Sequence, residues 1–143
     1  MSSAREPTKE PIVERKTINP WTWQDQFDFS HAIEVLGAQK VVYCAGQISV
    51  DAEGKPLHQG DMEAQFQCAL DNLERVLGQA GLALADLTRL NYFVTDVPAF
   101  LEAVPKVGIR LRAAGCKPAS TLLGVTRLAM PELMIELEAT AAV

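Results

Sequence analysis

The chain has 143 residues, of which 48% are hydrophobic and 22% are charged, and its net charge is −5. This length and composition suit one folded domain and exclude a wholly disordered chain. The acidic balance argues against a nucleic-acid partner, because such proteins use cationic residues to neutralise phosphates, and no apolar stretch approaches the roughly 20 residues of a membrane-spanning helix.

The N-terminal residues 1–11 are polar and show no periodicity, so we expect a flexible tail ahead of a single domain over residues 12–143. They also lack the apolar segment of a secretory signal. The three cysteines, Cys44, Cys68 and Cys116, are odd in number and widely spaced, which disfavours disulfides and a structural zinc site. Together these features predict a cytoplasmic protein with no bound metal.

The first part of the predicted domain is rich in strand-forming and aromatic residues. Residues 12–18 form a candidate edge strand, and an aromatic segment over residues 21–29 follows in an extended conformation. Residues 40–48 are apolar and partly β-branched, which predicts a buried strand. The stretch from Asp51 to Gly54 predicts a turn, in which glycine can adopt a positive φ.

An amphipathic helix is the clearest predicted element. Apolar residues recur at three- and four-residue steps over residues 62–80. Asp61 is a suitable N-cap, and Gly81 suits the position just after the helix.

The segment between residues 87 and 114 predicts a strand and a second helix. Residues 87–95 alternate in character, which places three apolar side chains on one face, namely Leu90, Tyr92 and Val94. Asp96 can cap a helix that runs to about Ala114. Pro105 lies inside that helix, and because proline removes a backbone hydrogen bond we expect a kink or a late helix start.

The last two predicted strands cover residues 120–128 and 133–142. In the second of them, period-two geometry places Glu136 and Glu138 on the same face. The order of elements predicts an α+β fold with two helices on one face of a mixed sheet. The other face still carries apolar residues, so we expect an oligomer that covers it.

Several short motifs follow one another from residue 29 to the C-terminus. They are Ala45-Gly46-Gln47-Ile48, Asp71-Asn72, Phe93-Val94-Thr95-Asp96, Pro118-Ala119, Val125-Thr126-Arg127-Leu128 and Ile135-Glu136-Leu137-Glu138-Ala139. Each motif alone is weak, but the ordered set resembles the RidA/YjgF family. The resemblance implies a chorismate-mutase-like fold and a homotrimer with a small-molecule cleft at each subunit interface. Family deaminases hydrolyse 2-imino or 2-enamine acids to 2-keto acids and ammonia, without a metal or organic cofactor.

The resemblance also implies that most of the family's polar active-site groups are changed in this chain. After Pro118-Ala119 the family's deaminases have an arginine that holds the substrate carboxylate through paired, charge-assisted hydrogen bonds, where this chain has Ser120. The family's water-positioning carboxylate is kept as Glu136, together with the backbone of Gly46. The other candidate substrate-binding positions are Phe29, Ala45, Val104, Thr121 and Leu122.

An apolar cleft of this kind disfavours a small anionic substrate, whose carboxylate would lose its hydration without a paired cation. We therefore expect a larger or more hydrophobic ligand. Glu136 is either a catalytic group that positions water or a partner in an ion pair across the interface, with Arg127 or Lys117. Ser120 and Thr121 are candidate ligand contacts but poor nucleophiles, because neither histidine is linked to them in the sequence.

Three functions stay open at this point. The first is a diverged hydrolase of an imine, enamine or related C–N compound, with Glu136 positioning water. The second is a non-catalytic trimer that binds a small metabolite, and the third is a ribonuclease, which the acidic charge disfavours most. The aromatic segment is either a lid over the cleft or packs onto the sheet edge or a neighbouring subunit. His31 is either an ordinary hydrogen-bonded histidine or a residue that lines the cleft.

Overall fold

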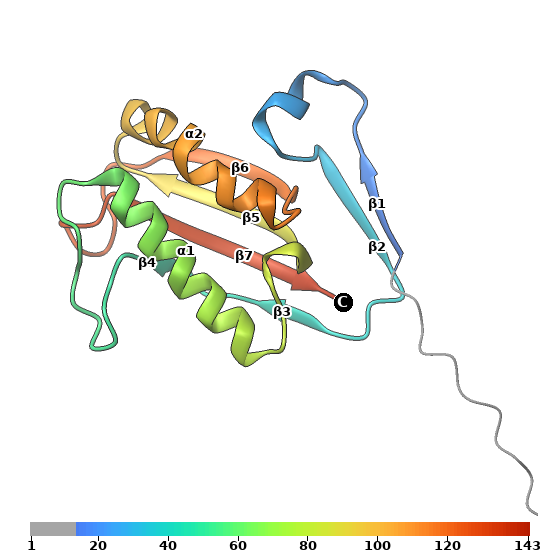
Figure 1. The fold of residues 1–143 in the computed structure, drawn as a ribbon, viewed down its shortest axis with the longest axis horizontal. Helices are drawn as coiled ribbons and strands as arrows, with labels where there is room; N and C mark the ends of the chain where they lie inside the picture. Colours follow the sequence, from blue (N-terminus) through green and yellow to red (C-terminus); the bar gives the residue numbers. More distant parts are fainter. Residues whose placement is uncertain (1–13) are drawn as a thin grey trace, which may run out of the picture.

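A mixed sheet with two helices on one of its faces makes up most of the molecule, whose computed structural model describes residues 14–143 (Figure 1). The strand order is β3-β7-β5-β6, and β4 pairs with β7 beside β3. The elements are β1 (Glu14–Ile18), the 3-10 helix η1 (Trp23–Phe27), β2 (Ala32–Leu36), β3 (Val41–Tyr43), β4 (Gln47–Ile48), α1 (Met62–Gln79), the 3-10 helix η2 (Leu84–Asp86), β5 (Leu87–Val94), α2 (Val97–Ala113), β6 (Ala119–Gly124) and β7 (Ile135–Ala142). This architecture confirms the predicted α+β fold with two helices on one face.

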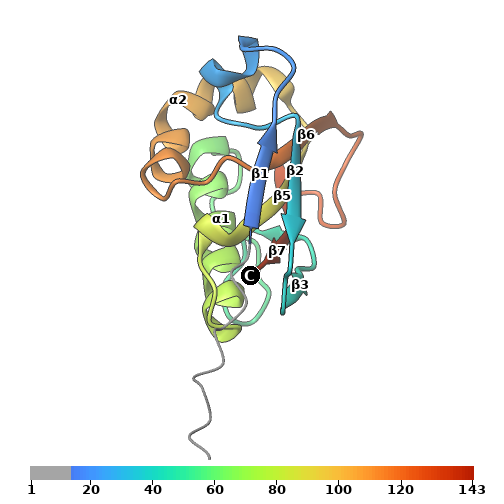
Figure 2. The ribbon, with the colours of Figure 1, turned by 90° about the vertical axis from the view of Figure 1, so that its right-hand side faces the viewer.

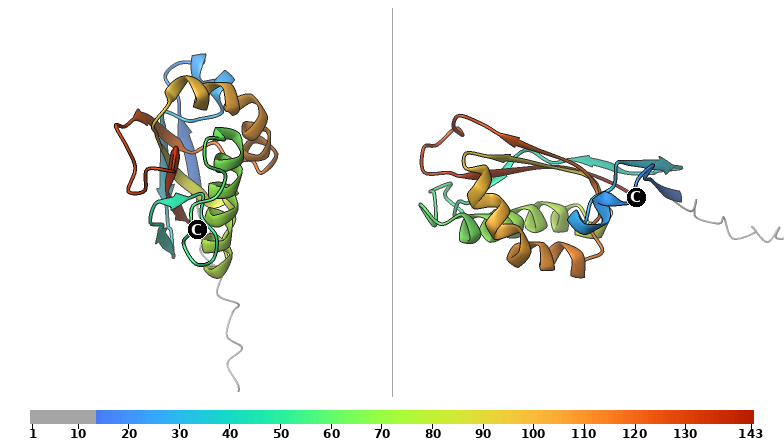
Figure 3. Two further views of the ribbon diagram at one scale, coloured as in Figure 1. Left: turned by 90° about the vertical axis from the view of Figure 1, so that its left-hand side faces the viewer. Right: turned by 90° about the horizontal axis from the view of Figure 1, so that it is seen from above.

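Strand β7 is the central strand of the sheet. It runs antiparallel to β3, β4 and β5, whereas β5 and β6 are parallel to each other. Four of its side chains are buried on the helix side: Ile135, Leu137, Ala139 and Ala141. Glu136, Glu138 and Thr140 alternate with them, which confirms that the two glutamates share a face. Seen from above, both helices lie on one side of the sheet and leave the other side uncovered (Figure 3).

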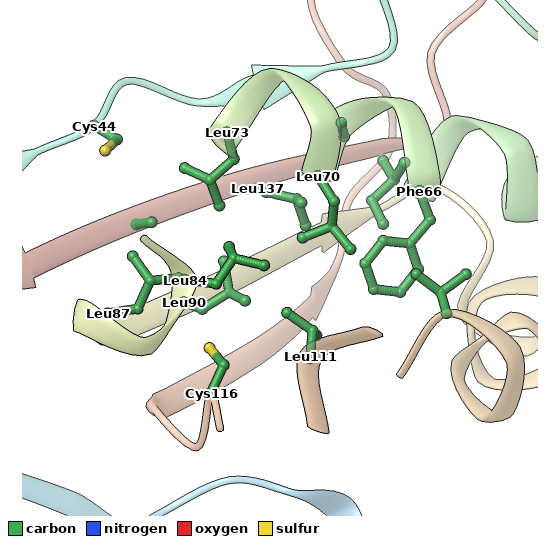
Figure 4. Close-up of a cluster of buried hydrophobic side chains, with 14 of the residues drawn as sticks. Cys44, Phe66, Leu70, Leu73, Leu84, Leu87, Leu90, Leu111, Cys116 and Leu137 are labelled. Carbon is green, nitrogen blue, oxygen red and sulfur yellow. The ribbon is translucent and has the colours of Figure 1, made fainter. Parts of the chain in front are cut away.

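The hydrophobic core lies between the sheet and the helices (Figure 4). Leu70 and Leu73 of α1 are fully buried and lie over β5 and β7. Leu90 and Val94 of β5 are also fully buried, as their predicted face requires. The aromatic rings of Phe66, Tyr92 and Phe100 pack together at one end of this core, with the centroids of Phe66 and Phe100 5.5 Å apart. Burial of apolar area in this layer is the main source of the fold's stability.

Both helices begin at the predicted caps. The side chain of Asp61 accepts a hydrogen bond from the backbone N–H of Ala64 at 3.0 Å, and that of Asp96 accepts one from Ala99 at 3.0 Å. Gly81 follows α1 with φ +74°, a backbone conformation that glycine adopts without strain. The predicted limits of the first helix are therefore confirmed to within a residue.

Helix α2 runs without interruption through Pro105, so the expectation of a late helix start is wrong. Proline cannot donate to the carbonyl of Leu101. Leu101 is 56% exposed, so water can hydrate the carbonyl that proline leaves free. The exposed side of a helix therefore tolerates a proline that the buried side would not.

The predicted strand over residues 40–48 is divided into β3 and β4. The backbone N–H of Cys44 donates to Ala139, and Gln47 pairs with Leu137. Two residues, Ala45 and Gly46, therefore lie opposite a single residue of β7, which is the pattern of a β-bulge. The prediction of one continuous buried strand is wrong because of this extra residue.

The last two strands are shorter than predicted, since β6 ends at Gly124 rather than residue 128 and β7 starts at Ile135 rather than residue 133. The backbone N–H of Met134 donates to the side-chain oxygen of Gln65 at 2.8 Å instead of to a strand. The guanidinium of Arg127 donates to the carbonyl of Leu128 at 3.1 Å, within the intervening loop. Hydrogen bonds of this kind cannot be inferred from alternation of polarity.

The N-terminal strands β1 and β2 form a separate hairpin beside the main sheet (Figure 2). Arg15 of β1 attaches it by donating to the carbonyl of Ala85 at 3.0 Å. Ser30 attaches the other end, because its backbone N–H donates to Pro118 at 3.1 Å. The expected tail over residues 1–11 and the start of the expected strand at residue 12 lie outside the described residues. Within residues 14–143, no helix has the length and apolar character needed to cross a membrane.

Gln65 is a fully buried polar residue that joins α1 to two loops. Its side-chain N–H donates to the carbonyls of Glu132 at 2.8 Å and His58 at 3.2 Å, while its oxygen accepts from Met134. Every hydrogen-bonding group of this buried amide is used in cross-linking chain segments that are far apart in sequence.

Replacing Gln65 with methionine, which has a similar volume, leaves the N–H of Met134 and the carbonyl of Glu132 without partners. We expect the free energy of unfolding to fall by roughly 2–4 kcal/mol. Chemical denaturation with urea measures this difference. Gln79→Met, at the exposed end of the same helix, is the matched control and should change stability little; an equal loss in both variants would contradict the role given to Gln65.

Candidate functional site

The structure divides the predicted site positions between the two sides of the sheet. Phe29, Val104, Ser120 and Leu122 line one cavity of about 330 Å³ on the helix side. Ser120 pairs with Leu90 in the parallel β5–β6 ladder, so its side chain points to the same side as that core residue. The remaining predicted positions, Ala45, Gly46, Thr121 and Glu136, are not among the residues that line this cavity.

A second cavity of about 440 Å³ adjoins the first beneath α2. The two cavities share five lining residues, Phe27, Asp28, Tyr92, Leu101 and Val104. We call the two cavities together the η1–α2 groove, because η1 with the residues after it forms one wall and α2 the other. The second cavity extends to Gly108, Leu111 and Cys116, none of which was predicted as a site residue.

An ion pair joins the two walls of the groove. The Asp28 carboxylate accepts from the guanidinium of Arg112 at 2.6 Å, and Asp28 has φ +55° at the end of η1. The hydrogen bond that Arg112 donates to Asp28 and the negative charge of that carboxylate raise the pKa of Arg112. Because Arg112 is mostly exposed, the pair fixes the geometry of the groove's edge more than it stabilises the fold.

Ser120 offers the groove only a neutral hydroxyl. Its Oγ donates to the carbonyl of Pro118 at 3.3 Å, a bond that keeps the side chain close to its own backbone. Of residues 14–143, the only charged side chains that line either cavity are Asp28 and Arg112, and these neutralise each other. The groove therefore presents no unpaired cation to a ligand carboxylate.

Phe29, which lines the groove, belongs to an aromatic cluster with Trp21, Trp23 and His31. The His31 ring meets the others edge-on, with centroid distances of 4.9 Å to Trp23, 5.1 Å to Trp21 and 5.5 Å to Phe29. Its Nε2 atom is buried and has no hydrogen-bond partner among residues 14–143. The segment forms a 3-10 turn rather than the extended conformation expected, and it both packs on itself and contributes Phe27 and Phe29 to the groove.

Glu136 and Gly46 are in direct contact on the uncovered side of the sheet. A Cβ atom built on Gly46 would lie 1.8 Å from Oε1 of Glu136, so only glycine leaves room for the carboxylate in this position. Glu136 is half-buried and forms no ion pair with any residue in 14–143. Arg127 donates to backbone carbonyls instead. Among the described residues 14–143, the Glu136 carboxylate beside the bulge at Gly46 therefore has no cationic partner.

The other side chains of the uncovered face are arranged in rows across the strands. Thr121 pairs with Asn91, which in turn pairs with Glu138, and the amide of Asn91 donates to that carboxylate at 3.3 Å. Phe93 and Glu136 form the neighbouring row. Thr121 therefore lies in the same row as Glu138, on the side of the sheet opposite to the groove that Ser120 lines.

The comparisons with known proteins agree on one family. The family model described as Endoribonuclease L-PSP matches residues 24–143, which is most of the chain. The chain belongs to the RidA/YjgF family. A RutC family protein of Pyrococcus abyssi is 28% identical over 79% of this chain and 84% of its own length. Protein DfrA of Myxococcus xanthus is 31% identical over 70% of this chain and 74% of its own length.

Solved Rid-family structures share the fold. YyfB of Yersinia pestis, a Rid-family protein, is 41% identical with a TM-score of 0.79 and covers 90% of this chain and 98% of its own. The YjgF gene product of Escherichia coli is 27% identical with a TM-score of 0.64 and covers 80% of this chain and 87% of its own.

Two residues that border the η1–α2 groove were not predicted from the sequence to do so. Asp28 and Arg112 are 84 positions apart, and no local pattern links them. Tyr92 was placed correctly on the core face, but alternation could not show that it also borders a cavity. No group of three or more histidine, cysteine or acidic side chains in residues 14–143 is arranged to hold a metal ion.

The cysteines differ in their surroundings. Cys44 and Cys116 are buried, whereas Cys68 on α1 is half-buried. Burial raises the pKa of the Cys116 thiol to about 12, and it also raises the pKa of Cys44. Both buried groups therefore stay protonated and unreactive at neutral pH, although Cys116 lines the groove.

We expect 5,5′-dithiobis(2-nitrobenzoate) to label Cys68 in the native protein at pH 8 well before Cys44 or Cys116, because the latter two are both buried and protonated. The absorbance of the released 2-nitro-5-thiobenzoate follows the reaction, and adding denaturant should expose Cys44 and Cys116 to the reagent. The variant Cys68→Ser should lose the early phase. A fast phase that persists in that variant would show that a buried thiol is accessible.

Proposed function

We propose that this protein is a Rid-family hydrolase of an uncharged imine, enamine or related C–N compound, acting in clefts between the subunits of a homotrimer. The proposal rests on one observation: the chain has the family's carboxylate, Glu136, but has a serine where the family's deaminases have a cationic arginine. Glu136 rests against Gly46 without a counter-ion in its own subunit, whereas the position of the family's carboxylate-binding arginine is Ser120 beside an apolar groove.

The proposed reaction is addition of water across a C=N bond followed by loss of ammonia. The Glu136 carboxylate accepts a proton as the water oxygen bonds to the imine carbon, and that proton passes to the nitrogen. In the resulting carbinolamine, Glu136 transfers the hydroxyl proton to the amino nitrogen as the carbon–nitrogen bond breaks and the C=O bond forms, so that imine and water yield a carbonyl compound and ammonia. No electrons are transferred, and the chemistry requires a base and a bound water rather than a redox cofactor.

The charge distribution of the groove supports an uncharged substrate. A carboxylate placed next to Ser120 would exchange its hydration for a single neutral hydroxyl, which costs several kcal/mol in an apolar site. Arg112 already pairs with Asp28, so its single positive charge would have to be shared between two carboxylates. An uncharged substrate avoids both costs.

The uncovered face of the sheet supports assembly with further copies of the chain. Its side chains include Val41, Tyr43 and Leu123, of which Tyr43 is 81% exposed. An apolar sheet face of this kind marks an interaction surface. A second copy bound to this face would cover the side of the sheet that carries Glu136, and a cleft between the two copies would then include that carboxylate.

A non-catalytic trimer that binds a small metabolite in the same clefts is the second candidate. The hydrogen bond that Ser120 donates to the carbonyl of Pro118 favours this second candidate. Ser120 stands at the position of the family's arginine, and its hydroxyl is already engaged with the backbone. The ribonuclease named in the family model's description suits this chain less well, since a net charge of −5 opposes binding of a phosphate backbone.

Glu136→Gln keeps the shape of the side chain but removes the proton acceptor. We expect the hydrolysis of uncharged imines, generated in situ by oxidation of the corresponding amines, to fall at least about 100-fold towards the spontaneous rate. Ammonia release measures the reaction. Light scattering should give the same mass for variant and wild type, three times the 15.6 kDa of one chain.

Glu138→Gln is the matched control, with the same change two residues along the same face of β7. Its carboxylate is engaged with Asn91 rather than with the bulge, so turnover should stay within about twofold of wild type. Equal turnover by the Glu136 variant and the wild type would refute the catalytic role. Absence of turnover in the wild type across the whole panel would favour the binding protein.

Ser120→Arg restores the cation at the groove. Arginine can form paired hydrogen bonds with a carboxylate, so we expect calorimetry to detect binding of 2-oxobutanoate, the product class of the family's deaminases, where the wild type shows none. Ser120→Met adds a side chain of comparable length without charge and should not bind it. If the arginine variant gains nothing, the cleft differs from the family's beyond this single position.

A further inference from the structure

The η1–α2 groove extends well beyond the position of Ser120, into a space that the proposed reaction does not use. Its inner part lies beneath α2 and is bordered by Phe66, Gly108, Leu111 and Cys116. The outer and inner cavities measure about 330 and 440 Å³, within the range that holds drug-sized molecules. A group of three atoms, the size of a short amino-acid side chain, would leave most of this space unfilled.

The polar groups of the groove specify the chemistry of an occupant. Tyr92 lines both cavities, and its hydroxyl makes no hydrogen bond within residues 14–143. Burial raises the pKa of Tyr92, so the phenol stays protonated and can donate a hydrogen bond. The thiol of Cys116 is likewise neutral, and Asp28 and Arg112 pair with each other. The groove therefore offers aromatic surface and a neutral donor, with no free charge.

The lining rings favour a flat occupant. Phe27 and Phe29 lie on the η1 side, and Tyr92 packs against both Phe66 and Phe100, with centroid distances of 5.8 and 5.2 Å. Aromatic side chains prefer edge and offset contacts with other rings. Leu101 and Val104 complete the opposite wall from α2.

We propose that the η1–α2 groove binds the uncharged aromatic part of a ligand that carries a hydrogen-bond acceptor for Tyr92. This inference rests on the proposed function only in identifying that ligand with the substrate, which would then be an imine or enamine bearing an aryl group. The binding site itself is formed by residues of a single chain and does not depend on Glu136.

Gly108 provides a way to fill the groove without disturbing the fold. A Cβ atom at this position would meet only Val104, at an ordinary contact distance of 3.9 Å. Gly108→Leu therefore extends a side chain along the inner cavity, and leucine has the higher helix propensity, so the variant should remain folded. Gly78→Leu is the matched control, because a Cβ at Gly78 on α1 meets nothing within 4 Å and Gly78 lines neither cavity.

The test uses the full-length chain and Prodan, an uncharged naphthyl ketone whose fluorescence reports an apolar site. Wild type and Gly78→Leu should bind it equally, whereas Gly108→Leu should bind at least tenfold more weakly. Tyr92→Phe should weaken binding about three- to tenfold, the effect of one lost hydrogen bond. The uncharged 2-acetylnaphthalene should displace Prodan, whereas 2-naphthoate, with the same rings and a carboxylate, should not.

Equal affinity of Gly108→Leu and wild type, or equal displacement by the ketone and the carboxylate, would overturn the inference. The proposed function is tested separately, because Glu136→Gln should bind Prodan as the wild type does. Binding that Gly108→Leu removes, in a protein that hydrolyses no aryl imine, would support the groove and refute the hydrolase. Hydrolysis of small uncharged imines by a protein that does not bind Prodan would support the hydrolase and refute the groove as a binding site.

Discussion

Strand β7 lies at the centre of the sheet, paired with β3 and β4 on one side and with β5 on the other, and its pleat divides the molecule into two sides. Ile135 and Leu137 point towards the helices and are fully buried. Glu136 lies between them in sequence and must therefore point the other way. A shift of one residue in the pairing of β7 would bury a carboxylate in the core and expose the leucine, so the hydrophobic pattern fixes the register and with it the position of the candidate base.

The same geometry separates the two parts of the candidate site. Ser120 pairs with Leu90 and lies on the helix side, whereas Glu136 lies on the uncovered side against Gly46. The sheet itself stands between them, so one subunit cannot bring both groups to one substrate. A reaction that uses both sides needs a second copy, and the apolar uncovered face provides a reason for that copy to bind. In the proposed trimer, assembly and chemistry would then both follow from the alternation of side chains along β7.

Periodicity was enough to predict the helices, the faces of β5 and β7 and the fold class, because burial on one side dominates the choice of residues there. It failed at Ala45 and Gly46, where an extra residue interrupts the strand, and at Met134, whose N–H is taken by Gln65. These features depend on single contacts between distant segments. The groove could not be predicted for the same reason, since its walls come from η1 and α2, which are far apart in sequence and are joined by the ion pair between Asp28 and Arg112.

Replacing one arginine with serine does not by itself explain why the whole groove is apolar, because the stability of the fold depends on the other groups that line it. An arginine removed alone would leave a site shaped for a carboxylate, with polar partners buried and unpaired, and such sites cost stability. Here Phe29, Val104 and Leu122 line the same cavity as Ser120, and the nearest charges, Asp28 and Arg112, satisfy each other. The remaining neutral donors can stay protonated and still bind an acceptor. The empty cavity therefore contains no buried, unpaired charge that would lower the stability of the fold. It disfavours anions because they would lose their hydration on entering it, and not because a negative charge repels them.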